Sequence, residues 1–207
     1  MSDKFAYFYQ SLREFDLRRF VSEWSAVGVM LFNPSNHLVT SLSEDGSQVR
    51  TSFEELEDLF YSRRPLVLQL WLSDDTDLSC RIGIIDENTL VEQYGLDGLH
   101  STELNTVIGA LVARFKRKAT SQVHNLFLII DCEGNTIDLN WNLLSKAGKY
   151  EGHFCPDVLG ISHSRSLDFS QCLEGDVVTK VGEYLIVIRS DSLSKSLSDV
   201  KTGQGAM

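Results

Sequence analysis

The stretch from residue 65 to residue 85 constrains the fold more than any other part of the chain. A nearly unbroken apolar run from Leu66 to Leu72 turns through residues 73–77 and returns as residues 78–85, where apolar residues alternate with smaller or polar ones. A short apolar run bounded by turn residues is typical of a strand buried on both faces, and alternation is typical of a strand with one wetter face. The stretch therefore predicts a central β-hairpin.

Helical patterns lie on both sides of this hairpin. Phe5, Phe8, Leu12 and Phe15 recur at helical spacing, and a second apolar stripe from Leu17 to Trp24 begins after a break near Asp16. We therefore expect the N-terminus to be helical, with a bend near Asp16.

Two further helices carry clear end signals. Ser52 and Glu55 have the spacing of a capping box, which predicts a helix over residues 51–62, and Pro65 ends it. Ser101 is expected to cap the longest helix, whose apolar residues follow the i, i+3, i+4, i+7 series as far as Phe115.

The remaining segments are shorter or less regular. Residues 26–32 with 37–42, 125–130 with 136–141, and 176–181 with 184–188 predict three more hairpins. Residues 87–98 are expected to form one or two helical turns. Residues 143–170 are loop-like because they hold several glycines and a proline with little periodicity.

Alternating helices and hairpins predict an α+β fold with a mostly antiparallel sheet of about six or more strands and two or three packed helices. We expect a single α+β domain over residues 1–189. Within it, residues 143–189 form either a small C-terminal subdomain or a cover for one sheet edge. The serine-rich tail of residues 190–207 is expected to be mobile.

Composition limits the classes of function. A formal net charge of −10 argues against a surface that binds nucleic-acid phosphates and suits a protein partner with a basic face. No apolar run is long enough to cross a membrane, and the N-terminus lacks the apolar centre of a secretory signal. These features predict a cytoplasmic protein without a membrane partner.

The cysteines and histidines form the first candidate site. Cys80, Cys132, Cys155 and Cys172 are widely spaced, so a disulfide framework is not expected and all four thiols should be free. His153, Cys155, His163 and Cys172 supply zinc-type ligands, but their spacing matches no ordinary zinc module. A Cys–His nucleophile pair in the same loop stays open. We expect no metal and no cofactor.

The acids of the central hairpin form the second candidate site. Asp74, Asp75 and Asp77 lie in one turn, without the glycine and distal glutamate of a calcium-binding loop. We interpret the turn as solvated and able to present negative charge to a partner. Three further acids follow within about twenty residues of the turn, which completes the predicted partner-binding set. They are Asp86, Glu87 and Glu92.

Two weaker candidates remain. The basic run from Arg114 to Lys118 occupies the last turns of a predicted helix, where cations suit the helix dipole, so nucleic-acid binding is not expected. Asp131, Glu133 and Asp138 surround one turn, where acids are common, although carboxylates at strand ends are also found in catalytic and metal-binding pairs.

The sequence holds no glycine-rich phosphate loop, no GxSxG and no HExxH. In general character the chain is similar to bacterial immunity proteins, which neutralise basic toxins; this is a likeness of class and of no particular residues. We expect a non-enzymatic binding protein of that kind. The alternative is an enzyme whose site is assembled from distant residues around the loop of residues 148–170.

Overall fold

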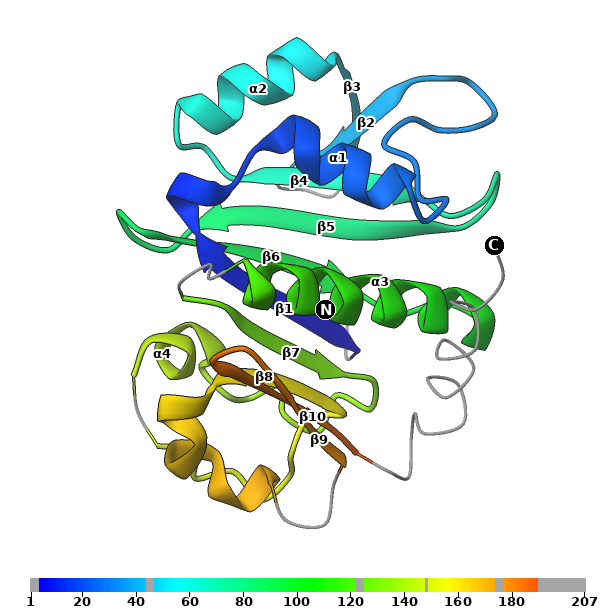
Figure 1. Ribbon diagram of the computed structural model, residues 1–207. Coiled ribbons are helices and arrows are strands. Elements are labelled where there is room, and N and C mark those ends of the chain that lie inside the picture. Colours follow the sequence, from blue (N-terminus) through cyan, green and yellow to red (C-terminus); the bar gives the residue numbers. More distant parts are fainter. Residues whose placement is uncertain (1–3, 44–46, 122–124, 148, 174–176, 190–207) are drawn as a thin grey trace, which may run out of the picture.

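The computed structural model describes residues 4–43, 47–121, 125–147, 149–173 and 177–189. They form an α+β fold around one ten-stranded sheet, in which all neighbouring strands are antiparallel (Figure 1). The strands follow the order β3-β2-β4-β5-β6-β1-β7-β8-β10-β9 across the sheet. Their bounds are β1 Phe5–Ser11, β2 Val39–Leu42, β3 Gln48–Thr51, β4 Leu66–Trp71, β5 Asp77–Ile84, β6 Thr89–Gly95, β7 Phe127–Asp131, β8 Val158–Ser162, β9 Val177–Val181 and β10 Tyr184–Ile188.

Helices cover the sheet unequally. Three helices contribute to the core on one face, which we call the helix face: α1 Leu17–Ser25, α2 Phe53–Tyr61 and α3 Ser101–Thr120. The opposite face is covered in part by the short helix α4 Trp141–Lys146 and the 3-10 segment η2 His163–Cys172. A short 3-10 turn, η1 Leu12–Glu14, connects β1 to α1. In Figure 1, α1 and α3 cross in front of the strands.

Side-chain alternation along β1 divides the interior into two cores. Ala6 and Phe8 join the core of the helix face, together with Leu111 and Phe115 of α3. Phe5 and Tyr9 join the core of the opposite face. Because successive strand residues point to opposite faces, a strand that is buried on both sides belongs to both cores. The second core is rich in aromatic residues, including Phe127, Trp141, Tyr150 and Phe169.

The strongest sequence signals are confirmed. The central hairpin is β4–β5, with Leu68 paired to Cys80. Ser52 and Glu55 form the predicted capping box of α2. The long helix α3 begins at Ser101, although its N-cap residue is His100 rather than Ser101.

The prediction of a helix from Phe5 to Phe15 is wrong, because residues 5–11 form β1 at the middle of the sheet. The aromatic residues of this segment fit helical spacing, but they also favour a strand and are needed on both faces. The prediction of a break near Asp16 is confirmed, since its side chain caps α1 by accepting a hydrogen bond from the amide of Arg19 at 2.7 Å.

Two other assignments are wrong for related reasons. Residues 87–98 contain β6 rather than helical turns, and residues 136–141 form no strand. The side chain of Asp131 folds the second segment into a loop, because it accepts hydrogen bonds from the amides of Glu133, Gly134, Asn135 and Thr136. α4 follows that loop directly.

The loop-like segment of residues 143–170 contains β8, which the sequence did not predict. Gly160 interrupts its apolar pattern, and a Cβ atom there would lie 2.8 Å from ring atoms of Phe115. The glycine therefore permits close packing of α3 on the sheet. Residues 26–32 hold only isolated bridges, Met30 to Trp71 and Phe32 to Val39, in place of the expected strand.

The predicted hairpin of residues 176–188 is present as β9–β10, with Gly182 at a positive φ of 57° in its turn. Together with β8, these strands form one edge of the common sheet, so residues 143–189 contribute strands to the sheet as well as covering elements. The predicted mobile tail of residues 190–207 lies outside the described residues.

Candidate functional site

The antiparallel order gives the sheet two ends with different surroundings. One end carries the β4–β5 turn, the start of β1 and the end of β7; Phe5 pairs there with both Gly95 and Asp131. The other end carries the β5–β6 turn and the β9–β10 turn. The eight residues of β5 separate the two ends by roughly 24 Å.

Acids gather at the first end. Asp74 and Asp75 are exposed in the β4–β5 turn, and Asp77 begins β5. Ser79 pairs with Gly95, so the same register brings exposed Asp97 to the level of Asp77. Exposed Glu133 follows β7, three strand positions from β5 or about 14 Å. We call these five residues the acidic end: Asp74, Asp75, Asp77, Asp97 and Glu133.

The structure separates the acids that the sequence grouped together. Asp86 and Glu87 lie in the β5–β6 turn at the opposite end of β5 from Asp74, Asp75 and Asp77. Glu92 lies at neither end, because it points into the helix-face core and is fully buried. Asp86, Glu87 and Glu92 therefore share no surface with the turn, and the expectation of one six-residue binding surface is wrong.

A cleft of about 1020 Å³ opens at the second end, which we call the cleft end. Its lining comes from several strands, helices and turns that meet at this end of the sheet. The described residues that line the cleft are Tyr9, Asp86, Glu87, Asn88, Thr89, Ala119, Thr120, Asn125, Leu126, Phe127, Ser145, Lys146, Ser162, Ser164, Arg165, Gly182, Glu183 and Tyr184. Its volume and mixed lining are typical of small-molecule sites.

An ion pair connects two walls of the cleft. The ammonium of Lys146, in the last turn of α4, lies 2.6 Å from a carboxylate oxygen of Asp86. Asp86 also accepts hydrogen bonds from the amides of Asn88 (2.9 Å) and Thr89 (2.8 Å). The hydrogen bond from Lys146 has the largest effect on the pKa of Asp86, and the hydrogen bond from the Asn88 amide has the next largest. Together they lower this pKa to about 2. Asp86 is thus a fixed anion that holds the turn against α4.

Arg165 of η2 presents a fixed cation to the same cleft. Its Nε donates to Asp168 at 3.2 Å, and its Nη1 donates to the carbonyl of Ser145 at 2.9 Å. Its guanidinium also lies 5.3 Å from the ring centre of Phe169 and 5.7 Å from that of Phe127. These contacts on several sides orient the guanidinium before any ligand binds.

The most highly charged part of the interior surrounds Glu92. Arg114 of α3 binds both carboxylate oxygens of Glu92, with Nη2 at 2.8 Å from Oε1 and Nη1 bonded to Oε2. Gln10 and Tyr94 also donate hydrogen bonds to this carboxylate. Burial and the charge of Glu92 raise the pKa of the Tyr94 hydroxyl. Glu92 and Arg114 therefore satisfy each other inside the protein.

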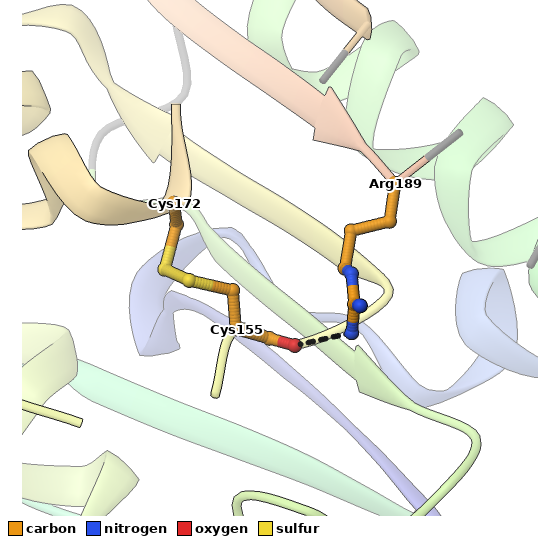
Figure 2. Close-up of a disulfide and its surroundings, with 3 residues drawn as sticks. All are labelled: Cys155, Cys172 and Arg189. Carbon is orange, nitrogen blue, oxygen red and sulfur yellow. Dashed lines mark hydrogen bonds between the residues drawn. A yellow bond between two sulfur atoms is a disulfide. The ribbon is translucent and has the colours of Figure 1, made fainter. Parts of the chain in front are cut away.

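Cys155 and Cys172 form a disulfide, so the expectation of four free thiols is wrong for this pair (Figure 2). The bond joins the segment before β8 to the end of η2, and Nη1 of Arg189 donates to the carbonyl of Cys155 at 3.2 Å. Sequence spacing did not reveal it because η2 folds residue 172 back over the second core. Cys80 and Cys132 are free, as expected.

The disulfide removes the thiolate that the proposed Cys–His nucleophile pair required. His153 and His163 are both exposed, and neither is among the described residues lining the cleft. Within the described part of the chain, no group of three or more His, Cys, Asp or Glu side chains is placed to hold a metal ion. Nor does any described helix have the length and apolarity to cross a bilayer.

Two features of the site were missed by sequence reasoning. The residues that line the cleft are spread from position 9 to position 184, so no local sequence pattern predicts the cleft. The buried role of Arg114 was also missed, because the helix dipole alone accounts for a basic run at the last turns of a helix. Its helical position, three and seven residues after the core positions Leu111 and Val107, was an available signal.

Comparison of the chain with protein-family models, with curated proteins and with solved structures found no match.

Proposed function

We propose that this is a non-enzymatic binding protein that recognises a basic protein partner through its acidic end. The observation that supports this most directly is the strand register, which brings acids from three separate segments to one end of the sheet. A surface that gathers several acids is complementary to the basic surface of a protein partner.

The acids of this end are accessible. Asp74, Asp75, Asp97 and Glu133 are exposed side chains on turns and loops, where a partner reaches them without disturbing either core. A concentrated negative field steers a basic partner and mainly raises the association rate. The net charge of −10 extends that field beyond the contact surface.

The finer proposal is an immunity-type inhibitor that neutralises a basic toxin or enzyme in the cytoplasm. Small size, acidity and the α+β fold support it as a class. In the cytoplasm, thiol reductants would keep Cys155 and Cys172 mostly reduced. Trapping the thiols in intact cells tests the compartment, since a fully oxidised pair there would contradict a cytoplasmic location.

The test compares the two ends of the sheet at equal charge. Asp74→Asn with Asp75→Asn removes two acids from the acidic end, and Asp86→Asn with Glu87→Gln removes two from the cleft end. Capture from source-cell lysate should recover the same basic protein with the parent and the cleft-end variant, and much less with the acidic-end variant. Equal recovery by both variants would remove the acidic end from the interface.

A second candidate function is favoured by the cleft. Ser162, Ser164 and Arg165, from the segment where an enzyme site was the alternative, line a cleft large enough for a small molecule. In this case the cleft would bind a polar ligand, with Arg165 as its fixed cation. Arg165→Met should abolish turnover or binding of such a ligand while retaining partner capture. Retention of all activity by Arg165→Met would remove this candidate.

A further inference from the structure

A cluster of cations lies between α1 and α3, on the helix face. At its centre, Glu23 of α1 is contacted by three arginines: Arg114 Nε at 2.7 Å, Arg19 Nε at 3.2 Å and Arg117 Nη2 at 3.3 Å. The Glu23 side chain is only 13% exposed, while those of Arg19 and Arg117 are 61% and 51% exposed. One carboxylate is therefore shared by a buried arginine and two surface arginines.

Lys118 adds a charge to the same cluster. It lies one helical turn after Arg114 and is only 5% exposed, yet it makes no hydrogen bond or ion pair with the described residues. Burial and the positive charge of Arg114 lower its pKa, while Glu23 and Glu92 act in the opposite direction. The tip of the side chain reaches solvent, and its ammonium adds a positive charge beside Arg114.

The charges of the cluster do not balance. Four cations, Arg19, Arg114, Arg117 and Lys118, surround the two carboxylates of Glu23 and Glu92, which leaves two positive charges. This excess occurs in a chain whose overall charge is −10, where acids for complete pairing are plentiful. The arrangement is therefore suited to an added dianion.

An open groove of about 640 Å³ gives access to the cluster. The described residues that line it are Arg18, Arg19, Ser22, Glu23, Ala26, Val27 and Arg117. Arg18 is already engaged, because it binds Glu57 and its guanidinium lies 4.8 Å from the ring centre of Phe53. Arg19 and Arg117 share the single carboxylate of Glu23 with Arg114, and they bring two guanidinium groups to the groove from α1 and α3.

We propose that this groove binds the phosphate group of a phosphomonoester. Arg19 and Arg117 would hold its oxygens from the two helices, while Lys118 and Arg114 supply positive charge from behind. A guanidinium presents paired N–H donors that match phosphate geometry, and a phosphomonoester carries close to two negative charges at neutral pH. The proposal does not depend on the acidic end or on the partner assigned to it.

The binding test uses the full chain, inorganic phosphate and O-phosphoserine as probes, and chloride at matched ionic strength as the reference. Titration calorimetry should detect phosphate binding by the parent. Arg19→Gln with Arg117→Gln should weaken it by about tenfold or more, because each variant removes a charge-assisted hydrogen-bond donor. Both side chains are at least half exposed, so this double variant should fold.

Arg81→Gln is the control for the loss of one positive charge, and it is compared with Arg19→Gln and Arg117→Gln made singly. Arg81 is exposed on β5, and its neighbours Cys80 and Ile82 point into the helix-face core, so Arg81 faces the other side of the sheet. Its removal should leave phosphate affinity within about twofold of the parent, an energy difference of less than 0.5 kcal/mol on the scale where tenfold is about 1.4. An equal loss in Arg81→Gln and in the single groove variants would mean non-specific charge attraction and would overturn the proposal.

Lys118→Met gives an independent readout. Lys118 is repelled by the positive charge of Arg114, so replacing its ammonium with an apolar side chain of similar length should not lower the melting temperature in phosphate-free buffer. It should also reduce the additional stabilisation that phosphate gives the parent. Tighter binding of O-phosphoserine than of inorganic phosphate would assign the site to an organic phosphomonoester, and equal binding would assign it to the phosphate group alone. Absence of parent binding beyond chloride would overturn the proposal.

Discussion

The two ends of the sheet carry charge in different ways. At the cleft end, acids and bases are paired with each other, as Asp86 is with Lys146, and they brace the walls of a cavity. At the acidic end, exposed acids from the β4–β5 turn, the end of β6 and the loop after β7 are spread along the same end of neighbouring strands. Paired charge fixes local structure, whereas concentrated like charge acts over distance.

The difference shows why residue type alone did not define a surface. Asp77, Asp86 and Glu92 lie within sixteen positions in the sequence, and each has a different environment. One begins β5 at the acidic end, one is ion-paired at the cleft end, and one is buried against Arg114. The predictions below separate these three environments by their effects on stability and binding.

The largest effect is expected for the buried acid. Glu92→Gln leaves the Arg114 guanidinium buried with one of its two carboxylate partners gone, which should lower the free energy of unfolding by about 3–5 kcal/mol. The melting temperature should fall by roughly 6 °C or more. Replacing both residues, Glu92→Leu with Arg114→Met, should recover most of that stability. A Glu92→Gln protein that melts with the parent would contradict a buried ion pair.

The disulfide should give the next largest effect. Cys155 and Cys172 are seventeen residues apart, and a cross-link over a loop of that length stabilises by about 3 kcal/mol. Chemical denaturation of Cys155→Ala with Cys172→Ala, compared with Cys132→Ala, should show this loss in the first variant alone. If added reductant leaves the stability of the parent unchanged, the bond contributes nothing to the fold.

The Asp86 ion pair should contribute less, because both partners are more than a third exposed. Asp86→Asn and Lys146→Met should each destabilise by about 0.5–1 kcal/mol. The folded pKa of Asp86, about 2, lies below its ordinary value of 3.8. Its contribution is therefore complete above about pH 4 and is lost as the pH falls toward 2. Acid-unfolding curves should show the parent and Asp86→Asn converging across that interval.

Local patterns predicted those parts of the fold that short-range contacts determine. Ser52 and Glu55 form a capping box within one helical turn, and the β4–β5 hairpin closes across a short turn. The failures depend on distant contacts: residues 5–11 are a strand because β6 and β7 lie on either side of them. β8 was missed because Gly160 interrupts its apolar pattern. This glycine is required by the ring of Phe115, which lies forty-five positions earlier in the sequence.

The same distinction applies to the candidate site. The sequence identified the exposed turn of Asp74, Asp75 and Asp77, since acids between two strands are expected at a solvated turn. It did not identify Asp97 and Glu133 as their neighbours, because only the register of β5, β6, β1 and β7 places them together. The cleft and the groove between α1 and α3 have the same long-range origin.

The association rate with the captured partner, measured at low and high salt, tests the central proposal most directly. For Asp74→Asn with Asp75→Asn, we expect slower association at low salt, a smaller salt dependence and a stability within about 0.5 kcal/mol of the parent. Asp86→Asn with Glu87→Gln should associate more nearly like the parent. Equal low-salt rates for the parent and the acidic-end variant would contradict the role assigned to the acidic end.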